Sequence, residues 1–416
     1  MLKSKVVNNA IMLYLMSFAR LVFPLLTLPY LTRILSTDTY GFVSYVRSCM
    51  TYLNLIVDFG FIFSAVKHVV NANGNKYKIG VIIGNTIVSK LLLVIISGII
   101  MLEMCITIDV LQLNILYVIL SFIAVGCTAF LLDFFFRGIE KMQYIAIIFL
   151  ISKGISVILT FIFVKNDSTI IWIPVLDIIT NIISVMLSYS YIAKNGYRIS
   201  FGGIKECLVS LKDSFIYFLS NISTSVFTVL NTLLIGVYMK DLKQVAYWSL
   251  CLNIISAIQG LYAPIISSIY PHMIHEKKLD FIHKVLSIFM PIVVVGCIFS
   301  FIVAKSALVI LGGEQYVNAY VLFRWMIPIL FFSFPAQIYG WPTLGAIGKA
   351  KETTASTIIA AVTQVIGLLI LGLTNHFTVI NLAILRFSTE ALMMCVRMIF
   401  TYKNKSAFIA SGVDSI

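Results

Sequence analysis

The sequence predicts an all-α polytopic membrane protein with about twelve transmembrane helices, and three observations support this fold class. Hydrophobic residues make up 60% of the 416 residues and charged residues only 11%, whereas a soluble domain carries roughly 25% charged residues. The mean hydropathy is +1.01. The apolar residues also gather in runs of the length that a helix needs to cross the hydrocarbon, about 20 residues.

Twelve apolar runs are long enough to span a bilayer, and most connections between them are short. This spacing excludes a large catalytic domain outside the membrane. The first run is too long for a cleavable signal and lacks a small-residue cleavage site, so we expect it to remain in the mature chain. The expected spans lie near residues 9–35, 40–66, 79–104, 112–136, 142–164, 169–193, 213–239, 245–270, 284–311, 317–347, 353–373 and 377–402.

The distribution of Lys and Arg predicts the orientation. The loops on one side carry 18 of these residues and the loops on the other side carry 5. Because basic loops stay on the cytoplasmic side, both termini should be cytoplasmic. The same bias explains the net charge of +13. No basic stripe interleaved with aromatic residues is present, so we expect no nucleic-acid partner.

The chain is expected to divide into two six-helix lobes, residues 1–200 and 201–416. Residues 194–213 form the longest connection and carry four basic residues. Ile204, Leu208 and Leu211 follow helical spacing there, which predicts a cytoplasmic amphipathic linker. Six helices per lobe indicate two bundles of the same topology, as in transporters built from parallel repeats.

Charged residues inside the expected spans are candidates for function, because each costs about 2.5–3.5 kcal/mol to insert. Arg20, Lys90 and Lys153 have no acidic residue within a turn on their own helix, so we expect them to be unpaired. Basic side chains facing a common cavity would attract an anion. The candidate substrate-binding cations are Arg20, Arg47, Lys90, Lys153, Arg324 and Arg386, and the candidate ion-coupling carboxylates are Asp58, Asp177 and Glu390.

Two pairs of these charges share a helix face. Arg47 and Asp58 are about three turns apart, and Arg386 and Glu390 are one turn apart. Internal pairing that only orients helices is the alternative interpretation of the second pair. Arg397 and Asp133 lie near the expected cytoplasmic ends of their helices, where their side chains can reach the headgroup region.

A polar face on the seventh expected helix is a candidate carbohydrate site. Its members are neutral hydrogen-bonding side chains, which can bind sugar hydroxyls or hold helices together. They are Asn221, Thr224, Thr228 and Asn231.

Motifs for chemistry are missing from the sequence. The five histidines lie in loops or at span ends, and none falls in a triad-like order with Ser, Cys or Asp. No P-loop, GxGxxG or metal-ligand spacing is present. We therefore expect no catalytic residues, no metal and no cofactor, and a transporter in place of an enzyme.

Several stretches carry a family resemblance. The opening PLLTLPYLTRIL (residues 24–35) and LIVDFGF (55–61), the stretch FFFRGIEKMQYIAI (134–147) and, more weakly, residues 266–273 and 309–326 resemble the Wzx-type flippases of O-antigen and polysaccharide units. These form a branch of the multidrug/oligosaccharidyl-lipid/polysaccharide exporter superfamily. The likeness covers nearly the whole chain.

The resemblance implies two six-helix lobes around a central cavity in a bacterial cytoplasmic (inner) membrane. It implies that the substrate is an undecaprenyl-pyrophosphate-linked repeat unit of O-antigen in lipopolysaccharide or of a related polysaccharide. Arg20 and Arg47 fall where related flippases keep arginines facing the cavity. The lipid bilayer, the polysaccharide polymerase and the chain-length regulator are the implied partners.

Two alternatives stay open at this stage. A cation-coupled drug antiporter of the same superfamily would have an acidic cavity in place of a basic one. A membrane-embedded polymerase or transferase would carry a long outer loop or a catalytic cluster at the membrane surface, and neither is visible in the sequence.

Overall fold

The computed structural model describes residues 2–408, and helices account for almost all of them. Within these residues, twelve helical segments are long and apolar enough to cross a membrane. Each overlaps one of the twelve expected runs, which confirms the predicted fold class. The chain divides into two compact units, of which the first ends at Ser225 and the second begins at Val226. The domain boundary expected at residues 200/201 stays a prediction.

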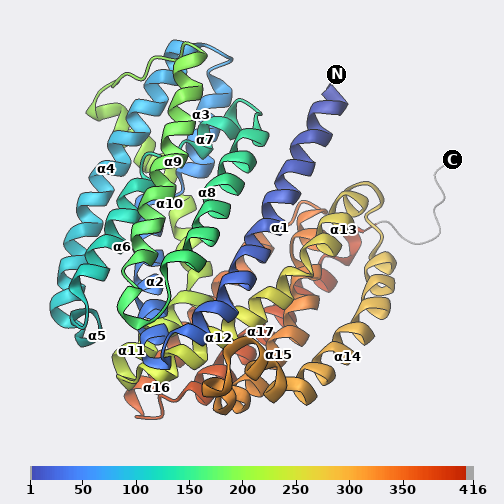
Figure 1. Cartoon of the computed structure of the whole chain (residues 1–416). Helices are drawn as coiled ribbons and strands as arrows, with labels where there is room; N and C mark the ends of the chain where they lie inside the picture. The colour runs from blue at the N-terminus through green and yellow to red at the C-terminus, as the bar shows by residue number, and fades with distance from the viewer. Residues whose placement is uncertain (1, 409–416) are drawn as a thin grey trace. The chain divides into compact units, whose positions relative to one another are not determined.

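The first unit contains the helices α1 to α10 (Figure 1). Helix α1 packs along α8, α8 along α9, and α9 along α6, whereas α2 and α10 pack on α4. The helices are α1 (Leu2–Ile34), α2 (Thr37–Asp58), α3 (Phe61–Asn71), α4 (Lys76–Thr107), α5 (Asp109–Gln112), α6 (Ile115–Thr128), α7 (Asp133–Gly138), α8 (Met142–Phe163), α9 (Trp172–Lys194) and α10 (Ile204–Ser225).

The second unit is built around α15 and α17, which pack against each other and carry many of its buried residues. Helix α16 covers α17, and α14 and α12 pack on α15. A π-helical turn, Val226–Leu230, precedes this set, and a second one, Tyr339–Gly345, follows α15. The helices are α11 (Asn231–Met239), α12 (Leu242–Gly260), α13 (Ala263–Glu276), α14 (Leu279–Gly312), α15 (Tyr320–Ile338), α16 (Ala350–Leu373) and α17 (Val379–Lys403).

Two pairs of membrane segments are broken at matching positions of the six-helix halves. The second segment breaks between α2 and α3, and the eighth breaks between α12 and α13. The fourth breaks between α6 and α7, and the tenth breaks at the π-helical turn after α15, where Gly340 has a non-helical ψ of −118°. This correspondence agrees with an internal repeat, and broken helices are common around transporter sites.

The break between α2 and α3 depends on Gly60. Phe59 and Gly60 both have positive φ, and a Cβ on Gly60 would lie 2.5 Å from Cβ of Tyr217 on α10. Only glycine combines this backbone conformation with so close an approach. The break makes Asp58 the last residue of α2, where the negative end of the helix dipole disfavours a carboxylate.

The connection between α9 and α10 is docked onto α4 by two glycines. A Cβ on Gly80 would lie 1.8 Å from the carbonyl oxygen of Arg198, and one on Gly84 would lie 2.1 Å from that of Ser200. The backbone N–H of Gly202 also donates to Oδ1 of Asn85, at 2.8 Å. The two small residues, four positions apart on α4, thus let another backbone lie directly on the helix.

This docking revises the expected structure of residues 194–213. Residues 197–203 are non-helical, and α10 begins at Ile204 and continues without interruption to Ser225. The amphipathic residues Ile204, Leu208 and Leu211 therefore belong to the first turns of a long helix and not to a separate segment.

Candidate functional site

A polar cluster in the first unit surrounds the break after Asp58. The ammonium group of Lys90 on α4 lies 2.9 Å from Oδ1 of Asp58. The side chain of Asn54 donates to Oδ2 of Asp58 at 3.3 Å and accepts from the hydroxyl of Thr128 at 2.8 Å. The Lys90 side chain is only 6% exposed, whereas that of Asp58 is 46% exposed. A buried cation thus holds a carboxylate that stays open to ligands on its other side.

More charges converge on the same region. The carboxyl of Asp133, in the first turn of α7, interacts electrostatically with Lys90, Arg137 and Arg20, and with Asp58. These three basic and two acidic groups leave one surplus positive charge. Both carboxylates lie at helix breaks, so the broken segments and not a loop outside the membrane bring these groups together.

A second charged group lies on α8 and α9. Nζ of Lys153 is 3.1 Å from Oδ1 of Asp177. Asp177 and Arg47 both interact electrostatically with the phenol of Tyr117 on α6. Two basic groups and one acidic group again leave a surplus positive charge.

The expectation that Lys90 and Lys153 are unpaired was therefore wrong. Each is paired with a carboxylate of another helix, Asp58 and Asp177 respectively. The face shared by Arg47 and Asp58 does not make them partners either, because Asp58 is bound to Lys90. Spacing along one helix cannot reveal a partner that the fold supplies from a neighbouring helix.

Arg20 and Arg47 differ from the paired lysines. Both side chains are exposed, and among the residues that the structure describes neither forms a salt bridge. The guanidinium of Arg20 lies 5.2 Å from the ring centroid of Phe149 on α8. These two arginines can therefore bind an anion without first losing a carboxylate partner.

The second unit contains a buried hydrogen-bond network around the π-helical turn Val226–Leu230. Arg386 forms an ion pair with Glu390 on the same helix, as the alternative interpretation of this pair held, and its Nε donates to the carbonyl of Phe227 at 3.0 Å. Asn231 also donates to this carbonyl, at 3.3 Å, and accepts from Gln364 at 3.1 Å. Arg386 and Glu390 are less than a tenth exposed, so they serve the interior of this unit.

The polar face expected on the seventh helix is divided. Thr224 and Thr228 are exposed and Asn221 is half-buried, but Asn231 is fully buried against Gln364. The wider π-helical turn between residues 226 and 230 changes the register of the helix. Asn231 therefore lies on a different face from the threonines.

Arg397 was expected to reach the headgroup region, and this was wrong. It is buried on α17 and donates to the carbonyl of Ala336 at 2.7 Å, to Ser356 at 3.0 Å and to Thr357 at 2.9 Å. Its Nη1 would lie 2.9 Å from a Cβ on Gly340. Arg397 thus stabilises the broken end of α15. Pro335 and Pro342, which lie near this break, are the feature of the sequence that indicated it.

Arg324, the remaining candidate cation, lines a groove on α14 and α15.

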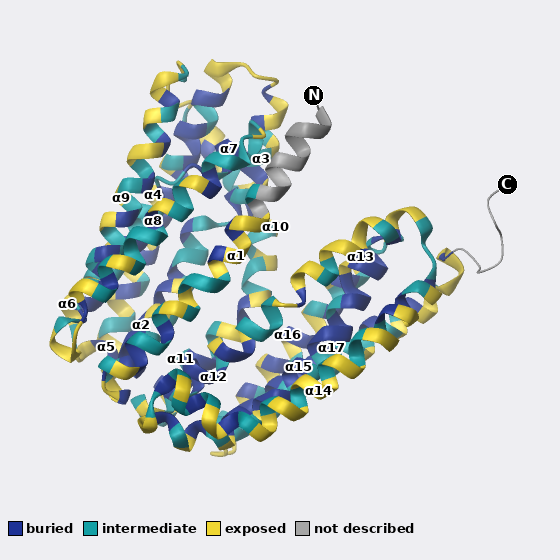
Figure 2. Ribbon diagram, turned by 45° about the vertical axis from the view of Figure 1, so that its right-hand side comes forward, coloured by how far each residue is buried: buried dark blue, intermediate teal, exposed yellow. Residues whose placement is uncertain are grey.

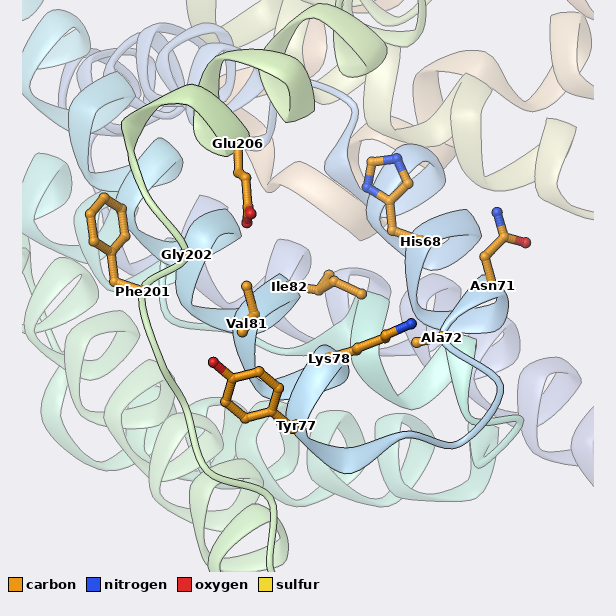
Figure 3. Close-up of a pocket in the computed structure, with 10 residues that line it drawn as sticks. All are labelled: His68, Asn71, Ala72, Tyr77, Lys78, Val81, Ile82, Phe201, Gly202 and Glu206. Atoms are coloured by element: carbon orange, nitrogen blue, oxygen red, sulfur yellow. The ribbon is translucent and has the colours of Figure 1, made fainter.

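Two polar pockets flank the short connection between α3 and α4. The first, of about 570 Å³, is lined by His68, Lys78 and Glu206, with Glu206 pointing in from the start of α10 (Figure 3). His68 bonds Asp213 at 3.1 Å, and Glu206 accepts from Asn85 at 2.7 Å. These contacts connect α10 to α3 and α4.

The second pocket, of about 430 Å³, contains part of the FFFRGIEKMQYIAI stretch. Lys141 donates to the hydroxyl of Tyr191 at 2.7 Å, and this hydrogen bond raises the pKa of Lys141 above its ordinary value. Burial likewise raises the pKa of Tyr197 on the opposite wall. Lys141 therefore stays cationic at physiological pH.

Twelve apolar segments, breaks at matching positions and charges at these breaks define a polytopic membrane protein of the transporter class. Residues 6–276 match the family of polysaccharide biosynthesis proteins. The chain belongs to this family, and its resemblance to the Wzx-type flippases is confirmed.

Two relatives agree with this assignment. A protein of Escherichia coli (strain K12) that is named for O-antigen transport is 26% identical over 410 residues, which cover 96% of this chain and 97% of the relative. A protein of Shigella dysenteriae with the same name is 28% identical and covers 67% of this chain and 69% of its own length. Both names describe transporters and not enzymes.

Solved structures share the fold. The inward closed conformation of the lipid II flippase MurJ has a TM-score of 0.70 at 13% identity, over 95% of this chain and 87% of MurJ. An inward-facing multidrug transporter of the MATE family has a TM-score of 0.68 at 14% identity, over 93% and 98% of the two chains. Both belong to the fold class expected from the sequence.

Proposed function

We propose that the protein moves undecaprenyl-pyrophosphate-linked repeat units of O-antigen, or of a related polysaccharide, from the cytoplasmic to the periplasmic leaflet of a bacterial inner membrane. The single observation that carries this proposal is the family match over residues 6–276. The name of the E. coli relative, which aligns along almost the whole chain, supports the O-antigen class of substrate.

The charges of the first unit favour an anionic substrate. Arg20 and Arg47 are exposed, and each accounts for the surplus positive charge of its own cluster. An electropositive cavity that contains these two arginines would bind the diphosphate, because guanidinium groups form strong paired hydrogen bonds with phosphate oxygens. Lys90 and Lys153 are each neutralised by a carboxylate, so the two arginines would be the main contacts of the diphosphate.

A protein is needed for this transfer because sugars do not enter hydrocarbon. Moving a hydroxyl into an apolar medium without a hydrogen-bond partner costs about 4–8 kcal/mol. A polar route would replace water around the sugars while the polyprenyl chain stays in the lipid. Exposed hydroxyls such as those of Thr224 and Thr228 are suited to this role.

Alternating access of the two six-helix halves would complete the transfer. With both termini in the cytoplasm, the anion would move outward, which an inside-negative potential favours by about 2.3 kcal/mol per charge per 100 mV. Asp58 is our first candidate for ion coupling because it is half exposed, whereas Glu390 is buried with Arg386. Asp177 is the second candidate.

The drug antiporter is less well supported. Such a protein carries cations, and the surplus positive charge of both clusters in the first unit would repel them. The likeness to the MATE structures concerns the fold alone.

Charge reversal in cells tests the proposal. The chain is expressed in a strain that lacks its own O-antigen flippase, with Arg20→Glu, Arg47→Glu or Lys351→Glu introduced. We expect both arginine variants to lose surface polysaccharide and to retain lipid-linked units on the inner leaflet. Lys351 is an exposed residue in the first turn of α16, where a glutamate suits the helix dipole, so its variant should remain active.

Two results would contradict the proposal. Full surface polysaccharide in both arginine variants, at membrane levels equal to those of the unaltered chain, would remove the arginines from the site. Unpolymerised units accumulating on the outer leaflet of the deletion strain would indicate a polymerase instead of a flippase.

A further inference from the structure

A groove of about 640 Å³ lies between α14 and α15 in the second unit. Ile298 and Phe301 line it from α14, and Tyr320 and Trp325 line it from α15. Of the described residues that line this groove, Arg324 is the only charged one. The groove is therefore an apolar surface with a single cation.

Neighbouring groups hold the guanidinium of Arg324 in place. Its Nε donates to the carbonyl of Phe301 at 3.1 Å, and the group lies 4.4 Å from the ring centroid of Phe301 and 5.1 Å from that of Tyr320. Within residues 2–408, its two Nη groups have no hydrogen-bond partner. Arg324 thus keeps donors for a ligand.

Helix α14 lies at the edge of its unit. Only 6% of its apolar 18-residue stretch is buried, and Figure 2 shows the helix mostly in the colours of exposed and intermediate residues. Ile298 is 56% exposed and Trp325 is 43% exposed. In a membrane, a helix with this surface contacts acyl chains.

The length of α14 gives the depth of Arg324. Its 34 residues make a helix of about 51 Å, which exceeds the hydrocarbon thickness of about 30 Å. Phe301 is eleven residues from the C-terminal end of α14. If the excess length of the helix is shared equally between its two ends, the carbonyl of Phe301 lies about 6 Å inside the hydrocarbon boundary on that side. A phosphate in the headgroup layer is within reach of an arginine at this depth.

We propose that this groove binds an anionic phospholipid, with an acyl chain along Ile298 and Trp325 and the phosphate on Arg324. One guanidinium balances the single charge of a phosphodiester. A diphosphate carries more charge than this groove neutralises, so the polyprenyl-linked substrate is not its occupant. The proposal does not depend on the function proposed above.

The bound lipid would add a contact to a helix at the edge of its unit. Among the described helices, α14 packs chiefly on α15 and on the turn Glu314–Ala319. An acyl chain in the groove would fill the space beside this contact, and the phosphate would join the lipid to α15.

Native mass spectrometry of the purified full chain tests this inference. The protein is titrated with phosphatidylglycerol or phosphatidylethanolamine, and bound lipids are counted. We expect one phosphatidylglycerol to bind preferentially, and Arg324→Gln to weaken it about tenfold, the effect of losing a hydrogen bond to a charged group. Arg324→Lys, which keeps the charge but not the planar group, should have an intermediate affinity. Lys284→Gln removes an exposed charge near the opposite end of α14, far from the groove, and should change nothing.

Quenching by brominated phosphatidylglycerol locates the lipid. The difference between the unaltered chain and Trp325→Phe reports the signal of Trp325, and this signal should be quenched only when Arg324 is present. Equal binding by Arg324→Gln, equal affinity for phosphatidylethanolamine, or displacement by a lower concentration of undecaprenyl phosphate would each overturn the proposal. The last result would assign the groove to a polyprenyl lipid.

Discussion

Nζ of Lys90 lies 2.9 Å from Oδ1 of Asp58, and the two side chains differ widely in exposure, at 6% and 46%. The pair joins α4 to the broken end of α2. The ion pair contributes more to the stability of the buried Lys90, because an isolated charge in the interior is strongly unfavourable.

This difference predicts unequal effects of two neutralising substitutions. Asp58→Asn leaves a buried cation without its partner and should destabilise the protein by about 3–5 kcal/mol. Lys90→Gln leaves a half-exposed carboxylate and should cost about 1 kcal/mol. Unfolding midpoints of the purified variants in the same detergent measure the order. Equal midpoints, or the reverse order, would show that the pair does not behave as a buried cation with an open carboxylate.

Combining the substitutions separates structure from function. Asp58→Asn with Lys90→Gln removes both charges and should recover most of the stability lost in Asp58→Asn alone. If Asp58 couples an ion to transport, the double variant should fold but still fail to produce surface polysaccharide. A double variant that is both stable and active would reduce the pair to a structural role.

The membrane spans could be predicted from the sequence, but the ion pairs between helices could not. All twelve segments could be predicted, because each must present about 20 apolar residues to the hydrocarbon whatever its neighbours are. Asp58 with Lys90 and Asp177 with Lys153 could not, because each pair joins two helices and only the packed structure brings them together.

Local irregularities explain the other differences. Asn231 appeared to share a face with Thr224 and Thr228, and the π-helical turn between them could not be read from apolar spacing. Arg397 was predicted to reach the headgroup region because it lies near a helix end, but its hydrogen-bond acceptors are on α15 and α16. Arg386 with Glu390 was predictable because both residues lie on one helix, a turn apart.

Because the connection between α9 and α10 lies directly on Gly80, a larger residue at this position should displace the connection. Gly80→Ala places a methyl group 1.8 Å from the carbonyl oxygen of Arg198, so the connection must move away from α4. We expect faster proteolytic cleavage within residues 195–203 and reduced transport. Gly154→Ala on α8 is the matched control, since nothing lies within 4 Å of its Cβ. Identical cleavage rates in the two variants would contradict the close docking.

Arg397 should stabilise the protein by supporting the break in the tenth membrane segment. Arg397→Gln removes the charged donor to the carbonyl of Ala336 and part of the bonding to Ser356 and Thr357. Loss of a hydrogen bond to a charged group is worth about 1.5–3 kcal/mol, so the unfolding midpoint should fall. Gly340→Ala crowds the same guanidinium from the other side and should have an effect in the same direction. An unchanged midpoint in both variants would remove Arg397 from the support of this break.

Transfer of a defined lipid-linked oligosaccharide across proteoliposomes tests the central claim most directly. The unaltered chain should expose the oligosaccharide at the far leaflet, and Arg20→Glu with Arg47→Glu should abolish the transfer while the protein remains folded. Transfer at the unaltered rate by this double variant would contradict the account, as would an unaltered chain that moves no lipid-linked sugar.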